Sequence, residues 1–421
     1  MISQKPITKI VSVVMALAVC LCLCAVAFSG QITVAAGDPG ITMEYETELF
    51  DLGSMITINI LMDDADWNDM LENALTEKYY PCNVEIGGTT FYRVAIRPKG
   101  NTSLTSIAND PTTDRYSFKL EFDHYVDGQT CFGLDKLVLN NNYADATNMK
   151  EALIYDMYQY LGADASLYNY AKVSVNGAYW GVYLALEAVE DSFMLRNYGA
   201  QNGELYKPEG MNMGGGEFDR ENRGNMDLGN RTPPDSGENP ADFEPSDRSQ
   251  QIPEDFSLPR GSDTADKRPG EPPTDFGDRP GSPGRNGGGA DLNYIDDDPD
   301  SYSTIWDGEI TNTTNADHKR VISDLKSIAQ GSSLETYMDV DNLLRYMAVH
   351  VFSVNEDSLS GTMAHNYYLY ESKGRLNLLP WDYNLSLGGM GKGNSAASVV
   401  NSAIDNAFSG TEFFDTLMEE E

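Results

Sequence analysis

Three polar residues near the C-terminal end of the sequence occur in an order that suits phosphoryl transfer. Asp357 follows an apolar helical pattern, Asn366 opens a stretch typical of a β-hairpin, and Asp382 closes that stretch between two aromatic residues. This order is that of kinase-like phosphotransferases. There, the first aspartate orients or deprotonates the acceptor hydroxyl, and the asparagine and second aspartate hold a divalent metal ion against the triphosphate. Few protein ligands are needed, because phosphates and water complete the coordination of Mg²⁺ or Mn²⁺.

The spacing of these residues leaves a second interpretation open. Asp357 and Asn366 are further apart than the aspartate and asparagine of a protein-kinase catalytic loop. By spacing alone, the alternative of an ordinary hairpin with solvated Asp and Asn at its ends is favoured.

A phosphate-binding loop is predicted in the stretch IRPKGNTS, residues 96–103, which follows a strand pattern. Small residues with free backbone N–H groups beside fixed cations can cradle phosphates. The alternative is a surface turn, because the stretch matches neither a Walker loop nor GxGxxG. The candidate phosphate-binding residues here are Arg97, Lys99, Gly100, Asn101 and Ser103.

The elements that must position these residues follow from hydrophobic periodicity. Alternating apolar and polar residues predict strands, with turns at GG (87–88) and NG (176–177). An amphipathic pattern predicts a helix over residues 145–162, with Thr147 or Asp145 as N-cap and Gly162 as its end. Further helices are predicted over residues 317–330 and 340–354, and the last residues, from about 401, are expected to form a helix.

Composition divides the chain into four parts. Lys5 and Lys9 flank an apolar run that ends in small residues, which predicts a signal peptide over residues 1–36, with an uncleaved membrane anchor as the alternative. Residues 41–210 are expected to fold. Residues 211–289 are dense in Gly, Pro and charged residues, so a disordered insertion is predicted. Order is expected to resume over residues 290–421.

Net charge limits the classes of partner that we expect, and the cysteine content limits the disulfides. Asp and Glu outnumber Lys and Arg by 65 to 29, and the formal net charge is −36. A chain this acidic repels nucleic acid and anionic lipid, so we expect no nucleic-acid partner, and a membrane contact only if the leader is uncleaved. Outside the leader only Cys82 and Cys131 remain, and either a disulfide or two buried thiols is expected of them.

A series of short motifs resembles one known family, the spore-coat protein H (CotH) kinases. The motifs occur in the family's order and cover most of residues 45–210 and 291–390. They are IRPKGNTS, RYSFKLEF, LVLNNNYADATNMKEALIYDMY, VSVNGAYWGVYLALEAVED, GELYKP, NEDS, HNYYLY and LLPWDYN.

The resemblance implies an exported atypical kinase that uses ATP and a divalent metal to phosphorylate Ser or Thr of secreted or cell-surface proteins. The implied fold is α+β and reduced kinase-like, with an antiparallel sheet in the N-terminal part and a mainly helical C-terminal part. The family's acceptor-activating aspartate matches Asp357 and its metal-binding aspartate matches Asp382, with Asn366 as a possible second ligand.

The nucleotide contacts are assigned by analogy with kinases in general. Lys119 is the candidate strand lysine for the phosphates, with Glu151 on the following helix as its ion-pair partner. Glu187 and Lys207 are competing choices for that pair. Trp381 is a candidate for stacking on adenine, with a place in the core as the alternative.

Two departures from the family support an alternative function. Where the family usually has a second aspartate two residues after the first, this sequence has Asn384. The family also continues past this motif with a helical stretch, and this chain ends soon after, so an incomplete C-terminal part is an open expectation. Both departures favour a catalytically inactive surface scaffold or binding module, whereas the joint presence of Asp357, Asn366 and Asp382 favours the enzyme.

Overall fold

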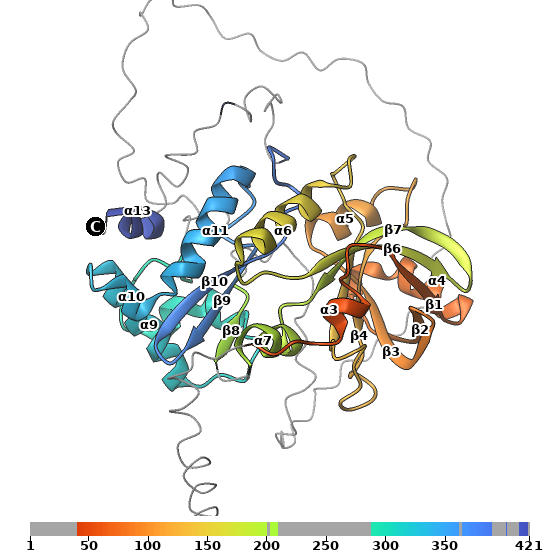
Figure 1. The fold of residues 1–421 in the computed structure, drawn as a ribbon, viewed down its shortest axis with the longest axis horizontal. Helices are drawn as coiled ribbons and strands as arrows, with labels where there is room; N and C mark the ends of the chain where they lie inside the picture. Colours follow the sequence, from red (N-terminus) through yellow and green to blue (C-terminus); the bar gives the residue numbers. More distant parts are fainter. Residues whose placement is uncertain are drawn as a thin grey trace, which may run out of the picture. The chain divides into compact units, whose positions relative to one another are not determined.

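Seven strands of the N-terminal part form a closed barrel in this computed structural model, which describes residues 40–199, 203–208, 288–361, 364–389, 401 and 412–419 (Figure 1). Neighbouring strands are antiparallel except for the first and the sixth, whose parallel pairing closes the barrel. The prediction of a purely antiparallel sheet was therefore wrong at this pair. In barrel order the strands are β1 (Ile56–Leu61), β2 (Tyr80–Ile86), β3 (Thr89–Lys99), β4 (Ser117–Glu121), β5 (Lys136–Asn140), β7 (Ala178–Glu187) and β6 (Tyr168–Val175).

The tight turns of the barrel lie where the sequence predicts them. Asn176 and Gly177 join β6 to β7 with φ of 49° and 80°, and Gly87 and Gly88 join β2 to β3 with φ of 58° and 84°. Two consecutive positive φ angles are typical of the type I′ turn, whose twist matches that of the strands. These local signals therefore confirm both predicted hairpins.

Short helices connect the strands, and one longer helix packs outside the barrel. That helix, α6 (Lys150–Leu161), ends as predicted at Gly162, which has a φ of 70°. It begins later than predicted, but the Asp145 carboxylate still accepts the backbone N–H of Lys150 at 2.8 Å. The remaining helices of this part are α3 (Tyr45–Glu48), α4 (Asp64–Glu72), η1 (Ala74–Thr76), α5 (Thr102–Ala108) and α7 (Asp191–Tyr198).

The C-terminal part combines helices with a small antiparallel sheet. The expectation of a mainly helical part is therefore met by the helices, and the sheet is an addition to it. The sheet has the order β10-β9-β8 and unites β8 (Glu204–Tyr206) with the hairpin of β9 (Tyr367–Ser372) and β10 (Arg375–Pro380). Both longer predicted helices are present. The helices are η2 (Pro299–Tyr302), α8 (Ser303–Asp307), α9 (Asn315–Ala329), α10 (Leu334–Tyr337), α11 (Val340–Ser353) and α13 (Glu412–Glu419).

Two hydrophobic cores support these parts. One fills the barrel, and the other joins α6 to α9, α11 and the β9–β10 hairpin. Tyrosines are prominent among the largest fully buried side chains of the second core, and they bring buried hydroxyl groups into it. Because α6 belongs to this second core, it connects the barrel to α11, after which Asp357 lies, and to the β9–β10 hairpin, after which Asp382 lies.

Other sequence predictions lie mainly outside the described residues. The leader, residues 1–36, and nearly all of the insertion, residues 211–289, are not described. Cys82 and Cys131 are described and are buried free thiols, which agrees with the second of the two expectations for them. None of the described helices is long and apolar enough to cross a membrane.

A buried carboxyl group on α9 makes folding stability depend on pH. Asp324 is 3% exposed, and its Oδ2 atom has no hydrogen-bond partner in the described part of the chain. Burial and the nearby Glu371 raise the pKa of Asp324 to about 7, while Arg320 lowers it. The folded state therefore binds a proton more tightly than the unfolded state, and stability falls as pH rises from about 4 to about 7.

We expect Asp324→Asn to raise the melting temperature at pH 8 and to leave it nearly unchanged at pH 5. A buried polar group without a partner costs roughly 1–3 kcal/mol, and asparagine removes the charge at nearly equal volume. Melting at both pH values measures the effect. Asp307→Asn, at an exposed aspartate of α8, is the control. An equal shift for Asp324→Asn at the two pH values would contradict the assignment.

Candidate functional site

The β9–β10 hairpin brings Asn366 and Asp382 to the same end of the small sheet. Lys373 and Gly374 form the turn with φ of 57° and 78°, and Tyr367 pairs with Pro380 at the open end. The residues just before Tyr367 and just after Pro380 must therefore lie close together. The hairpin predicted from sequence is confirmed, and its register places both candidate residues at its mouth.

Asp382 is a half-buried carboxylate without a hydrogen bond or close ion pair to any other described residue. Its backbone is left-handed, with a φ of 59°. Burial is the main cause that raises its pKa; Asp357 raises it further, while Lys99, Lys207 and His365 lower it. This side chain thus lies among charges of both signs and keeps both oxygens available for a cation.

Asp357 lies directly after α11 and is held by two neighbours from the mouth of the hairpin. Its Oδ1 atom forms an ion pair with Nε2 of His365 at 2.8 Å. The side-chain amide of Asn366 donates to Oδ2 at 3.1 Å and to the backbone carbonyl of Asp357 at 2.9 Å. The structure therefore joins Asn366 to Asp357. The sequence analysis did not include His365 among the site residues, and its position beside Asn366 in the sequence is the signal that could have identified this contact.

Several residues near Asp357 and Asp382 have left-handed backbone. Val354, Ala364, Asn366 and Asp382 have φ between 46° and 60°. Such conformations cost about 1–3 kcal/mol each for residues other than glycine, and a β-branched residue such as Val354 is least suited to them. Strain of this kind persists where the surrounding structure fixes it, and it concentrates at functional sites.

The lysine beside Glu151 is Lys99, and not Lys119 as predicted. The Lys99 ammonium donates to Oδ1 of Asn140 at 3.2 Å, and Nδ2 of Asn140 donates to Oε2 of Glu151 at 2.9 Å. Lys119 instead forms an ion pair with Glu190 at 2.8 Å. Asn140 is a residue that the sequence analysis missed as part of the site, although it begins the NNNY stretch of a family motif.

Burial is the main cause that shifts the pKa values of Glu151 and Lys99. It raises the pKa of Glu151 to about 7, with the nearby Asp382 as the second cause, while Asn140 and Lys99 lower it. Burial lowers the pKa of Lys99, and Lys207 adds to this effect, whereas Asp382 and Glu151 oppose it. Oε1 of Glu151 is buried without a hydrogen-bond partner in the described residues. The cluster therefore has unsatisfied acceptors that a bound cation would satisfy.

The other charged candidates have different partners. Arg97 forms an ion pair with Glu77. Glu187, a competing choice for the lysine partner, forms an ion pair with Arg196 at 2.7 Å. Lys207, the other competing choice, acts on the pKa of both Lys99 and Asp382, so it belongs to the neighbourhood of the site.

The predicted phosphate loop runs from the end of β3 into a helix that the sequence analysis did not predict, α5. Gly100 has a φ of 128°, and a Cβ atom there would lie 2.6 Å from Oγ of Ser103. Only glycine fits this close turn without strain. Asn101 precedes α5 and makes no side-chain capping bond. Asn101 and Ser103 thus lie at the start of α5, close after Lys99 in the sequence.

The aromatic residues that flank Asp382 are core residues. Trp381 is 4% exposed, contacts the ring of Tyr368 edge-on, and lies with its ring 5.5 Å from the Lys99 ammonium. Tyr383 is 1% exposed. The burial of Trp381 therefore agrees with the alternative of a place in the core. Its ring also stabilises the Lys99 ammonium through a cation–π contact.

The acidic residues of the site suit a metal ion that arrives with phosphates. Among the residues that the structure describes, no group of three or more His, Cys, Asp or Glu side chains is arranged to hold a metal ion by itself. Mg²⁺ is commonly bound by one or two carboxylates together with substrate phosphates and water. The free carboxylate of Asp382 and the unsatisfied Oε1 of Glu151 fit such a cation.

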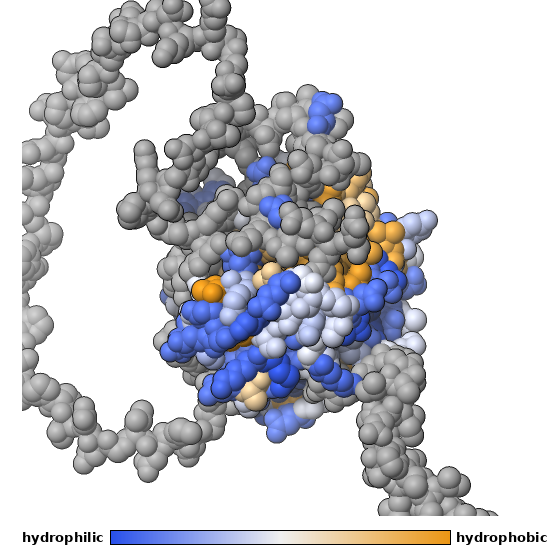
Figure 2. Space-filling view, turned by 90° about the vertical axis from the view of Figure 1, so that its left-hand side faces the viewer, coloured by the Kyte–Doolittle hydropathy of each residue, from blue (hydrophilic) through white to orange (hydrophobic). Residues whose placement is uncertain are grey.

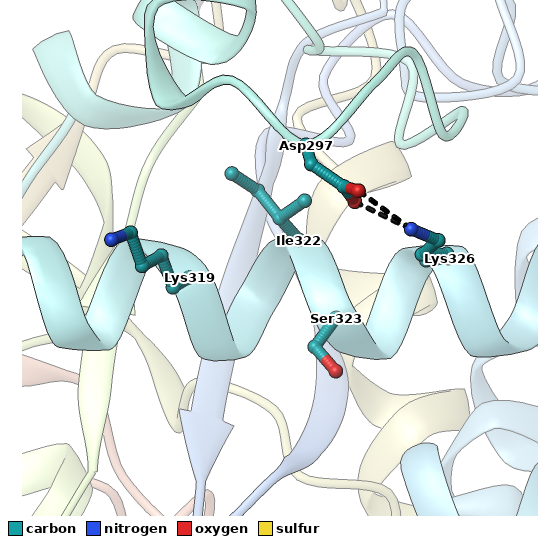
Figure 3. A pocket seen from close by; sticks show the side chains of 5 residues that line it. All are labelled: Asp297, Lys319, Ile322, Ser323 and Lys326. Atoms are coloured by element: carbon teal, nitrogen blue, oxygen red, sulfur yellow. Dashed lines mark hydrogen bonds and ion pairs between the residues drawn. The ribbon is translucent and has the colours of Figure 1, made fainter.

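A surface pocket of about 340 Å³ lies elsewhere, along α9 (Figure 3). Asp297 and Lys326 lie across its edge and form an ion pair at 2.7 Å, and Lys319 extends from the same helix. It contains none of the predicted site residues. The face shown in Figure 2 is mainly hydrophilic, with hydrophobic residues gathered on one part of it.

Comparisons with known proteins identify the family of this chain. The chain is 23% identical over 264 residues to the inner spore coat protein H of Bacillus subtilis (strain 168), a match that covers 62% of this chain. The chain spans about half of that relative, 52% of its length. The family described as CotH kinase protein matches residues 96–257 and 281–421, which include every residue of the cluster around Asp382. The chain belongs to the CotH kinase family.

Proposed function

We propose that this protein is an exported atypical kinase that transfers the γ-phosphate of ATP to Ser or Thr hydroxyls of secreted or cell-surface proteins, with Mg²⁺ or Mn²⁺. Membership of the CotH kinase family supports a kinase-related function. The observation that carries the proposal is the position of Asp382. Its carboxylate has no partner among the described residues, and Lys99 and Asp357 are close enough to change its pKa.

Each group has a role that its surroundings suit. Asp382 is the protein ligand for the divalent cation, which would neutralise charge on the phosphates. Lys99 binds phosphate oxygens, with the loop of Gly100, Asn101 and Ser103 beside it. Glu151 and Asn140 fix the Lys99 ammonium in place. Transfer of a phosphoryl group depends mainly on positioning and charge neutralisation, which these fixed groups supply.

Asp357 acts on the acceptor hydroxyl. Its carboxylate would accept the hydroxyl proton or orient the hydroxyl toward the γ-phosphate. His365 and Asn366 each contact one of its oxygens, so the carboxylate has a fixed orientation. Asn366 becomes a positioning residue for Asp357 in this scheme, in place of the metal ligand that we expected.

The cellular location follows from two observations. The sequence begins with the pattern of a signal peptide, and the matched relative is named as an inner spore coat protein. We infer an extracytoplasmic or surface location and protein substrates in the same compartment.

Thermal melting with ATP and Mn²⁺ tests the proposal. A ligand present at 100 times its dissociation constant stabilises the folded state by about 2.7 kcal/mol, so the wild-type melting temperature should rise. Lys99→Met should weaken nucleotide binding roughly 10- to 100-fold, because a hydrogen bond to a charged group contributes about 1.5–3 kcal/mol. Lys119→Met is the matched control, since the ammonium of Lys119, on β4, pairs with Glu190 at the start of α7.

The outcomes separate the possible assignments. Lys119→Met is expected to lower the melting temperature of the free protein and to keep the shift with ATP and Mn²⁺. Loss of the shift in Lys119→Met and its retention in Lys99→Met would restore the assignment made from sequence. No shift in folded wild-type protein would favour the inactive scaffold, which Asn384 also favours because its amide donates to the backbone carbonyl of Tyr143 at 3.3 Å.

A further inference from the structure

A chain of buried hydrogen bonds crosses the second core and ends beside both candidate carboxylates. His350 of α11 lies at its centre and is 2% exposed. Its Nδ1 atom is 3.0 Å from the hydroxyl of Tyr383, and its Nε2 atom is 2.7 Å from the hydroxyl of Ser360 and 3.2 Å from that of Ser358. Tyr383 is also hydrogen-bonded to the hydroxyl of Tyr158 on α6, at 2.6 Å.

The partners of His350 lie next to the residues that would react. Tyr383 directly follows Asp382, and Ser358 directly follows Asp357. One imidazole ring thus contacts both loops at the position adjacent to each carboxylate. We infer that His350 is a positioning residue that sets the distance between Asp382 and Asp357, and thereby between the cation-bound phosphates and the acceptor hydroxyl. This inference rests on the proposed function for its catalytic consequence, but not for its structural one.

The two loops that His350 contacts contain strained backbone, which these contacts stabilise. Each loop contains a residue in the left-handed region, Val354 before Asp357 and Asp382 itself. Strained residues of this kind relax unless their neighbours fix them. The loops are also joined by one backbone hydrogen bond, from the N–H of Leu387 to the carbonyl of Ser353 at 2.6 Å. His350 supplies the second connection, through side chains, so the two loops cannot move independently.

The chemistry of neutral imidazole suits this role. Burial lowers the pKa of His350 to about 4, so the ring is neutral at ordinary pH and has one donor and one acceptor nitrogen. A hydroxyl can donate or accept, and therefore Tyr383 and Ser360 can match either tautomer. An apolar residue of similar size would take one hydrogen-bond partner from each of these hydroxyls, and this loss is costly for a buried one such as that of Tyr383.

Tyr383→Phe tests the inference with little change in volume, because it removes only the hydroxyl that joins His350 to the loop of Asp382. Tyr206→Phe is the matched control, since Tyr206 is fully buried in the same core and its hydroxyl has no hydrogen-bond partner among the described residues. Amide hydrogen exchange should accelerate in both loops, residues 353–360 and 381–387, in Tyr383→Phe. It should be unchanged there in Tyr206→Phe.

Kinetics give the second readout. In Tyr383→Phe we expect kcat for phosphate transfer to fall roughly 10- to 100-fold, the effect of a displacement near 1 Å, with the KM for ATP within about threefold of wild type. A purely structural hydroxyl would lower the melting temperature without this separation of kcat from KM. Ser358→Ala removes the contact on the other loop, and the double variant should lose less than the product of the two single losses.

The results can be assigned separately to this inference and to the proposed function. Faster exchange confined to residues 381–387, with residues 353–360 unaffected, would overturn the connection through His350. Coupled acceleration with wild-type kcat would overturn the positioning role. If wild-type protein transfers no phosphate, the proposed function fails, and hydrogen exchange still decides whether His350 joins the two loops.

Discussion

Asp382→Asn is expected to abolish the rise in melting temperature with ATP and Mn²⁺ and to reduce phosphate transfer below detection. Its carboxylate is the proposed protein ligand of the cation and has no hydrogen bond or close ion pair to another described residue. An amide oxygen carries no full charge, so it holds a divalent ion weakly. Asparagine is one of the residues most often found with left-handed backbone, so the variant changes the charge without adding backbone strain.

The control for this variant is Asp135→Asn in the barrel. Asp135 is a buried aspartate, and burial raises its pKa to about 7. Its carboxylate accepts the backbone N–H of Ser192 at 3.3 Å, and the charges that act on its pKa come from Glu190, Lys136 and Asp191, none of which is a candidate site residue. We expect Asp135→Asn to change the melting temperature of the free protein and to keep the shift with ATP and Mn²⁺. A full shift in Asp382→Asn would rule out Asp382 as the cation ligand.

Asp357→Asn is expected to lower kcat by roughly 10² to 10⁴ while nucleotide binding is preserved. Proton transfer by a positioned carboxylate contributes acceleration of that order. Asp357 contacts His365 and Asn366 and does not hold the phosphates in the proposed scheme. Single-turnover transfer of labelled phosphate, measured beside thermal melting with ATP and Mn²⁺, separates the two effects.

The control for Asp357 is its exposed neighbour Glu356. Glu356→Gln removes one negative charge from the same loop, so it should leave kcat within about twofold of wild type, since an exposed charge is strongly screened. Transfer at the wild-type rate in Asp357→Asn would overturn its role at the acceptor hydroxyl. Equal losses in both variants would indicate a general charge effect of the loop.

Local elements were predictable wherever turn residues and periodicity coincide. The NG and GG turns, the glycine end of α6 and the β9–β10 hairpin all follow from neighbouring residues. The helix α5 was missed because it is only seven residues long and has no regular apolar pattern. The closure of the barrel was missed for a different reason. It depends on the pairing of Ile56 with Ala171, and periodicity does not identify a strand's partner at such a distance in sequence.

The sequence by itself determined which residues are candidates for the reactive groups. It supplied Asp357, Asn366 and Asp382 in a meaningful order, and the turn chemistry of the hairpin then placed Asn366 and Asp382 at one end of a sheet. Such information is local, because a hairpin register is fixed by its turn and by the alternation of its side chains.

Only the tertiary structure decided which lysine lies in the hydrogen-bonded group with Asn140 and Glu151. Lys119 pairs with Arg97 across β3 and β4, whereas Lys99 is two residues further along β3, at the rim of the barrel, opposite Ser117. Asn140 ends β5 at that same rim, where its side chain contacts Lys99 and Glu151. The choice between two lysines therefore depends on strand register and on the packing of α6. Contacts between residues far apart in the sequence fix the strand register and the packing of α6. The residues next to either lysine in the sequence do not indicate these contacts.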